Sequence, residues 1–150
     1  MPDTRNLVAG IESVLTKLLD VTGASRSTLR ADDEARGWMS SVPCAEVLRH
    51  GAPTMLNDRS LNHRAAATIR WIDETRSILK QPDLAGISPS PPRALMETYF
   101  AKAQMVGPVC VDGQLYGWVS AHDIQRPRAW TVADEAAMVN AINAVNALLA

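Results

Sequence analysis

The sequence predicts an α+β domain built on an antiparallel sheet, with the first and last helices packed together on one face. Three observations predict this class. Apolar residues recur at helical spacing at both ends of the chain. Between them, QMVGPVCV, Asp112-Gly113 and QLYGWVSAH read as two strands joined by a tight turn. The middle of the chain is cut by Pro and Gly into short segments, which is typical of α+β proteins with short elements.

Length and charge limit the possible classes of fold and function before any motif is considered. The chain has 150 residues, of which 47% are hydrophobic and 21% charged, and its formal net charge is -1. These values predict one globular domain over residues 1–150. Binding to nucleic acid or to an anionic membrane needs clustered Lys and Arg, and the composition shows no such excess. We therefore expect neither nucleic acid nor membrane as a partner.

The first half of the chain begins with a clear helix. An amphipathic stripe predicts a helix over about residues 4–21, and Gly23 provides its C-terminal stop. The segment ASRSTLRAD, residues 24–32, reads as a first strand. The following stretch is divided by Gly and Pro, and TML at 54–56 is its expected short strand.

The second half adds two helices before the hairpin and one after it. Residues 62–79 are helix-like, although SILKQ at their end would also serve as a strand. PDLAGISPSPP is a loop, and a short helix is expected over 93–101. Thr131 caps the last helix. Arg126 and Arg128 flank Pro127 in a loop, where we expect them to be solvated.

The hairpin turn predicts which side chains share a face. A type I′ turn at Asp112-Gly113 places Val111 opposite Gln114, and each further pair follows from it. Trp118 then lies opposite Gly107, which leaves room for its indole. One face is aliphatic and suited to the terminal helices: Val106, Cys110, Leu115, Val119 and Ala121. The other face carries Met105, Val109, Tyr116, Trp118, Ser120 and His122.

This second face is the candidate ligand site. A solvated face would more often carry Thr, Lys and Glu than Trp and Met, so we expect it to be covered. An apolar floor with a few hydrogen-bonding groups is the general form of a small-molecule site. The predicted ligand-binding residues on this face are Met105, Tyr116, Trp118, Ser120 and His122. The alternative is a second core layer in which the polar tips bond to backbone.

The middle helix adds three candidates. Trp71 can close over the sheet, and Thr68 and Arg64 precede it by one and two turns on roughly the same side. An arginine there suits an anion, so the expected ligand is a small molecule that is anionic or aromatic. A solvated helix face is the alternative interpretation of the same spacing.

Three segments together resemble the GAF domain family. HGAPTMLND is similar to the family's tG-x-P stretch, VGPVCVDGQLYGWVSAHD to its strand pair, and RPRAWTVADEAAMVNAINAVNALL to its entry into the last helix. The resemblance implies a sensory module with a central antiparallel sheet, the N- and C-terminal helices on one face and a ligand pocket on the other. It gives a fold and a function class but no particular ligand.

The hairpin is also similar to a segment of phytochrome GAF domains, L-W-G-L-x-x-x-H-H-x-x-x-PR. There the first His reaches a bilin, and His122 occupies its place, which implies that His122 points into the pocket. Trp118 stands where that pattern has Leu, and Asp123 stands where it has the second His. The signature that holds the tetrapyrrole has no counterpart, so no bilin is predicted.

Catalytic and metal chemistry have little support in the sequence. His50 and His63 stand at no metal-ligand spacing to His122, so neither a metal site nor a cofactor is predicted, although a haem held by one axial His stays open. Some stand-alone GAF proteins reduce free methionine sulfoxide with several loop cysteines. Here Cys110 is expected on the aliphatic face and only Cys44 in a loop, so no enzymatic activity is predicted.

The expected function is a cytoplasmic GAF-type sensor that acts through a partner protein. The N-terminus lacks the pattern of a signal peptide, the cysteines form no CxxC pair, and no residues remain for an output domain. The apolar stripes of the terminal helices exceed what one sheet face can cover, which predicts a homodimer through these helices. The rival hypothesis is a ligand-free dimerisation module.

Overall fold

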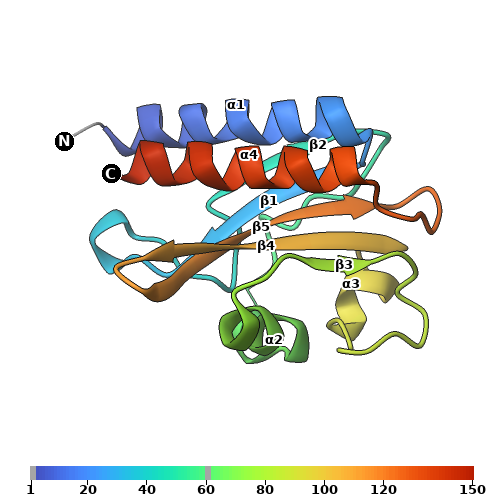
Figure 1. Cartoon of the computed structure of the whole chain (residues 1–150). Coiled ribbons are helices and arrows are strands. Elements are labelled where there is room, and N and C mark those ends of the chain that lie inside the picture. Colours follow the sequence, from blue (N-terminus) through green and yellow to red (C-terminus); the bar gives the residue numbers. More distant parts are fainter. Residues whose placement is uncertain (1–2, 60–61) are drawn as a thin grey trace.

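The computed structural model, which describes residues 3–59 and 62–150, has helices on both faces of an antiparallel sheet (Figure 1). The strands are β1 (Arg26–Ala31), β2 (Ala45–Leu48), β3 (Leu79–Gln81), β4 (Ala103–Val111) and β5 (Gln114–Asp123). They pair in the order β2-β1-β5-β4-β3. The α+β class predicted from the sequence is confirmed, and β5 is the central strand, flanked by β1 and β4.

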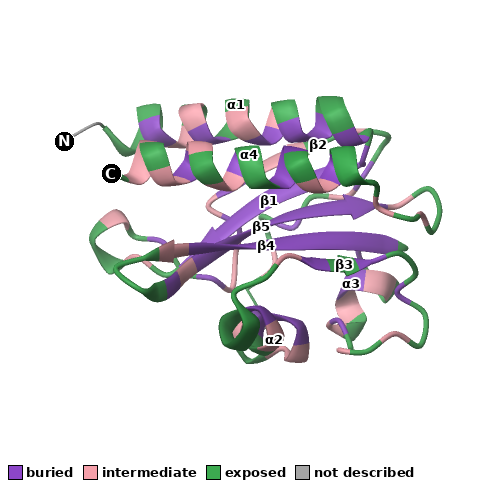
Figure 2. Ribbon diagram, viewed as in Figure 1, coloured by how far each residue is buried: buried purple, intermediate pink, exposed green. Residues whose placement is uncertain are grey.

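The terminal helices α1 (Thr4–Thr22) and α4 (Val132–Leu149) lie side by side on one face of the sheet (Figure 1). α1 ends at Gly23, whose φ of 67° is the left-handed conformation expected of a glycine stop. α4 begins with a capping box between Thr131 and Asp134. Figure 2 shows the buried residues of both helices turned toward the sheet. The main core lies there and includes Leu7, Ile11, Leu15, Leu19, Leu29, Val119, Met138 and Val145.

Shorter elements cover the opposite face. They are α2 (Ala67–Thr75), α3 (Arg93–Glu97) and the 3-10 turn η2 (His63–Ala65), whereas the turn η1 (Glu34–Arg36) follows β1. Two smaller apolar clusters lie under them. One cluster joins α2 to the sheet through Ile69, Ile72, Leu79, Val106, Leu115 and Trp118, and the other contains Met55, Leu84, Leu95, Tyr99 and Ala101.

Two sequence predictions in the middle of the chain need correction. The helix predicted over 62–79 is divided into η2, α2 and β3, because Arg76 adopts a left-handed conformation that ends α2. The strand predicted at 54–56 is absent, and β2 lies at 45–48 instead. The Met55 N–H donates to the carboxylate of Glu46 on β2, so a side chain satisfies this backbone group in place of a strand partner.

Arg128 joins the ends of three elements and is not the solvated residue expected from the sequence. Its Nη1 donates to the Thr22 carbonyl at the end of α1 over 2.6 Å, and its Nη2 pairs with Asp134 at the start of α4 over 2.9 Å. Its Nη1 also lies 3.8 Å from the carboxylate of Asp123 at the end of β5. The guanidinium stacks on the Trp130 ring at 4.5 Å. One side chain therefore holds both terminal helices against the central strand.

The register of the β4-β5 hairpin departs from the prediction after two pairs. Asp112 and Gly113 have φ values of 51° and 77°, as a type I′ turn requires, and Val111 lies opposite Gln114. Beyond Cys110 and its partner Leu115, however, Val109 faces Gly117. Tyr116 is thus the extra residue of a β-bulge, which the two-residue turn does not reveal.

The bulge exchanges the faces of several side chains. Trp118 lies opposite Pro108, not Gly107, and Gly107 lies opposite Val119 beneath α4. Met105, Val109 and Tyr116 therefore pack with the terminal helices, whereas Val106, Cys110 and Leu115 pack on the same side as Trp118. The predicted faces are wrong for these six residues, because a single inserted residue reverses the alternation of a strand.

The two hairpin glycines allow a direct test of this packing. A Cβ on Gly117 would collide with the backbone carbonyl of Arg30, which cannot move without disturbing β1. A Cβ on Gly107 would meet Ile142 Cδ1 and Met138 Sδ, the ends of side chains that can rotate. We expect Gly117→Ala to lower the free energy of unfolding by about 3 kcal/mol and Gly107→Ala by about 1 kcal/mol. Urea unfolding measures both, and the reverse order would contradict the bulge.

Candidate functional site

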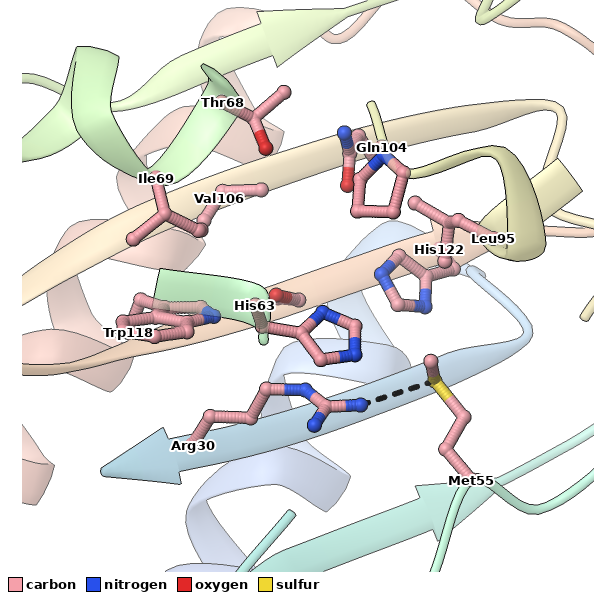
Figure 3. Close-up of a pocket in the computed structure, with 12 residues that line it drawn as sticks. Arg30, Met55, His63, Thr68, Ile69, Leu95, Gln104, Val106, Trp118 and His122 are labelled. Atoms are coloured by element: carbon pink, nitrogen blue, oxygen red, sulfur yellow. Dashed lines mark hydrogen bonds between the residues drawn. The ribbon is translucent and has the colours of Figure 1, made fainter. Parts of the chain in front are cut away.

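A small cavity lies between the sheet and the short elements that cover its second face (Figure 3). Its volume is about 20 Å³, room for about one water molecule. β1, β4 and β5 supply its floor: Arg30, Gln104, Val106, Trp118, Ser120 and His122. η2, α2, α3 and the adjoining loops supply its roof: Met55, His63, Thr68, Ile69, Pro92 and Leu95.

His122 enters the cavity from the end of β5. It is paired with Arg26 of β1, and Arg26 Nε donates to His122 Nδ1 over 2.9 Å. Burial, together with the nearby charges of Arg26 and Arg30, lowers the pKa of His122 well below its ordinary value. The imidazole is therefore neutral and carries its proton on Nε2. Among the described residues Arg26 is its one hydrogen-bond partner, so the Nε2–H remains available to a ligand or water.

Two arginines of β1 support the floor. Arg26 and Arg30 are 0% and 3% exposed. Burial lowers the pKa of each guanidinium to about 10, which leaves both groups charged at neutral pH. Arg30 Nη1 donates to the Ser40 carbonyl over 3.0 Å, and Nη2 lies 3.8 Å from Met55 Sδ. Figure 3 shows the Arg30 guanidinium beside the imidazole of His63.

His63 closes the roof from η2. Burial and then the charge of Arg30 lower the pKa of its imidazole to about 4, and Asp58 acts in the opposite direction. His63 is therefore neutral at physiological pH. It also lines a surface groove of about 260 Å³ between η2 and the proline-rich loop, as does Pro92. These two residues separate the groove from the cavity.

Neutral polar groups complete the lining. Ser120 and Thr68 contribute hydroxyl groups from β5 and α2, and within the described chain neither side chain is bonded to another residue. Gln104 donates its amide N–H to Gln81 over 2.7 Å, which leaves the Gln104 carbonyl oxygen free to accept. The cavity is therefore lined by polar groups that have no protein partner.

The structure brings only some of the predicted site residues together. Trp118, Ser120, His122 and Thr68 line the cavity together. Trp71 instead packs, half-buried, against the apolar cluster under α2. Met105 and Tyr116 lie on the helix side of the sheet, so their predicted place on the pocket face is wrong, and the cause is the bulge. The hydroxyl of Tyr116 donates to Asp33.

Arg64 covers Trp118 from outside the cavity. Its guanidinium lies 5.4 Å from the ring centre. Its Nε pairs with Asp32 over 2.6 Å, and its Nη atoms donate to the carbonyls of Leu115 and Tyr116 at the bulge. Arg64 therefore fastens η2 to the sheet and does not line the cavity. The structure thus places it away from the anion-binding position that the sequence predicted.

Much of the cavity lining was not predicted from the sequence. Arg30 could have been found, since Arg26, Thr28 and Arg30 alternate with Ser27 and Leu29 along the first strand. Gln104 and Val106 could have been found only with the correct hairpin register. Met55, His63 and Pro92 come from irregular segments, and no periodic signal in the sequence points to them.

A comparison with protein families identifies the fold. The family model for the GAF domain matches residues 6–148. The chain belongs to the GAF family. The resemblance predicted from the three sequence segments is thereby confirmed, and with it the central sheet that has both terminal helices on one face. No curated protein sequence matches this GAF domain significantly.

Solved structures with the same fold come from sensory proteins and from an enzyme. The PixJ GAF domain of Thermosynechococcus elongatus, in its blue-light absorbing form, is 20% identical, with a TM-score of 0.73 over 97% of this chain and 88% of that one. The chromophore-binding domain of a bacteriophytochrome from R. palustris is 18% identical, with a TM-score of 0.72 over 95% and 55%. Free methionine-R-sulfoxide reductase from Neisseria meningitidis is 13% identical, with a TM-score of 0.69 over 98% and 79%. At these identities the likeness concerns the fold alone.

The two thiols of this GAF domain lie on opposite sides of the sheet. Cys44 packs against the core under the terminal helices, and burial raises the pKa of its thiol to about 12. Cys110 packs with the Trp118 side, where Arg76 Nη1 lies 3.3 Å from its sulfur. The prediction that Cys110 lies on the aliphatic sheet face under the terminal helices is therefore wrong. Neither cysteine lines the cavity, and the sheet between them prevents a disulfide.

In the described residues, no helix is both long and apolar enough to cross a membrane.

The two neutral imidazoles predict how stability depends on pH. The pKa of His63 is lower in the fold than in the unfolded chain, so acidification below about pH 6.5 protonates the unfolded chain first and destabilises the fold. His122 acts in the same direction. From pH 7 to pH 5 we expect His63 alone to reduce the free energy of unfolding by on the order of 2 kcal/mol.

Urea unfolding at pH 7, 6 and 5 measures this loss. His63→Gln should flatten the dependence on pH. His50→Asn is the matched control, because His50 is exposed in a turn with a φ of 57° that Asn tolerates. An unchanged slope in His63→Gln would show that His63 is not held neutral by burial.

Proposed function

We propose that this GAF domain is a sensory module that binds a small molecule in the cavity under η2 and α2 and acts through a partner protein. The observation that carries the proposal is the set of polar groups that line the cavity and have no protein partner: the His122 Nε2–H and the hydroxyls of Ser120 and Thr68. Such groups can form hydrogen bonds with a further molecule placed in the cavity. The family supports the same conclusion, since small-molecule sensing is typical of GAF domains.

The cavity has to widen before it admits more than a water molecule. The neighbouring groove can supply the space, because His63 and Pro92 line both the cavity and the groove. If the His63 side chain swings outward, the two spaces join into a volume close to that of small-ligand sites, which begin near about 300 Å³. The sheet forms the floor and Arg64 fastens η2 to it, so the moving part of the site is the His63 side chain.

The ligands suggested by the structural neighbours do not fit well. A chromophore that absorbs visible light needs an extended conjugated system, and the joined space is small for such a molecule. A sulfoxide reductase that uses cysteines needs thiols at its site, and Cys44 and Cys110 lie outside the cavity. We therefore propose a binding role without catalysis.

The outer surface of the terminal helices is the proposed route to a partner. An apolar groove of about 380 Å³ runs between α1 and α4, and its lining includes Val14, Leu18, Val21, Ala141 and Ala144. Val21 is 58% exposed. We propose that a second copy of the chain covers this groove, giving a homodimer in the cytoplasm. The two unpaired cysteines fit a reducing compartment.

Native mass spectrometry of freshly purified protein tests the ligand proposal. We expect an added mass of a small molecule on the wild type, its loss in Trp118→Ala and His122→Ala, and its retention in Val119→Ala. Val119 is fully buried under the terminal helices, so its truncation should cost about 1–3 kcal/mol of stability without touching the cavity. Thermal unfolding confirms that each variant is folded.

A ligand-free dimerisation module is the second candidate function. The small volume of the cavity favours it, since a space for one water needs no ligand. In that case no added mass is seen on any variant, and a screen of metabolites leaves the melting temperature unchanged.

Sedimentation velocity tests the homodimer. We expect a dimer at micromolar concentration and a shift toward monomer in Val21→Glu, which places a charge in the groove. Val132→Glu is the control, because Val132 is 86% exposed at the start of α4 and lies outside the groove lining. A monomeric wild type would refute the proposed interface.

A further inference from the structure

Two buried positive charges beside the cavity form no direct ion pair within the described chain. Arg26 and Arg30 are almost fully buried, yet neither takes part in any salt bridge among the described residues. All their hydrogen-bond acceptors are neutral: the carbonyls of Pro53, Tyr99 and Ser40, the His122 imidazole and the Met55 thioether. Neither guanidinium is therefore in direct contact with a carboxylate in the part of the chain that the structure describes, although buried charges in proteins are normally paired.

The carboxylates whose charges act on these arginines are already engaged. Asp58 acts on Arg30 and accepts from the Tyr99 hydroxyl. Glu46 acts on both guanidinium groups through its charge. Its oxygens, however, accept from the Thr54 hydroxyl and from the Met55 N–H. Glu46 thus fixes the loop that carries Met55 and forms no direct pair with either arginine.

The unused donors belong to Arg30. Every nitrogen of the Arg26 guanidinium donates to a strong acceptor, over 2.9 to 3.2 Å. On Arg30 only Nη1 does so, whereas Nη2 faces a thioether 3.8 Å away and Nε has no acceptor among the described residues. Arg30 is also the charged residue that lines the cavity. An arginine edge with free N–H groups matches the two oxygens of a carboxylate.

The groups around Arg30 are suited to a single negative charge. The Nε2–H of His122 and the hydroxyl of Ser120 can donate to the same oxygens, and both imidazoles are neutral. The charges of Glu46 and Asp58 already offset part of the charge of the two arginines, so a singly charged group suits the site better than a doubly charged phosphate. Trp118 and Ile69 offer an apolar wall for the rest of the ligand.

We infer that the cavity recognises a small monocarboxylate, with its carboxylate on Arg30, Ser120 and His122 and its apolar part against Trp118 and Ile69. This inference rests on the proposed ligand-binding function and gives it a ligand class. The carboxylate displaces the weak contact between Arg30 and the Met55 sulfur, and His63 admits the ligand from the groove.

Isothermal titration with matched pairs of probes tests the inference. Acetate, butyrate and benzoate are each compared with the corresponding amide, which has nearly the same shape and no charge, at constant ionic strength. We expect the wild type to bind at least one carboxylate at least about tenfold more tightly than its amide. Arg30→Met should abolish this preference. Arg36→Met should retain it, because Arg36 pairs with Asp33 away from the cavity.

The outcomes separate this inference from the proposed function. A small molecule that co-purifies and proves neutral would overturn the carboxylate and leave the sensory role intact. The absence of any co-purified molecule and of any binding probe would overturn both. If Arg30→Met fails to fold, Arg30→Lys keeps the charge but lacks the paired N–H groups, and its preference for carboxylate should fall several-fold. Equal binding of acid and amide by the wild type, or an unchanged preference in the Arg30 variants, would refute the role of Arg30.

Discussion

The side of the sheet that carries the cavity depends on the buried guanidinium of Arg26. Its three nitrogens hold His122 of β5, the Pro53 carbonyl of the loop after β2 and the Tyr99 carbonyl after α3. Two irregular segments far apart in the sequence are thereby attached to one point of the central sheet. The same contact sets the protonated nitrogen of His122. Without it, the roof loops would lose their fixed position and the imidazole its orientation.

The hairpin illustrates how far sequence reasoning reaches. The turn at Asp112-Gly113 and the terminal helices could be predicted, because they depend on local turn chemistry and on apolar periodicity. The GAF family was indicated by the resemblance of three segments to that family. The faces of the hairpin could not be predicted, because the bulge at Tyr116 is imposed by tertiary packing. Gly117 has to approach the Arg30 carbonyl closely, and only the neighbouring strand shows this. A glycine between two aromatic residues was the available signal.

The candidate site was predictable only where it lies on regular strands. Trp118, Ser120 and His122 share a face by simple alternation, and the same rule applied to the first strand would have added Arg30. The roof follows from no such rule. His63 reaches the cavity because η2 is fastened to the sheet by Arg64, a contact between residues separated by more than fifty positions.

Arg128 gives the cavity a mechanical connection to the opposite surface. Asp123 follows His122 directly on β5, and its carboxylate lies 3.8 Å from Arg128 Nη1. The same guanidinium donates to the Thr22 carbonyl at the end of α1 and pairs with Asp134 in the first turn of α4. A displacement of the strand end by even a fraction of an ångström would therefore change the geometry of a charged junction shared by both helices. Because β5 carries both His122 and Asp123, a shift of this strand at the cavity would reach both terminal helices through Arg128. The fold thus connects the terminal helices to the residue beside His122 through one side chain, although the helices and the cavity lie on opposite sides of the sheet.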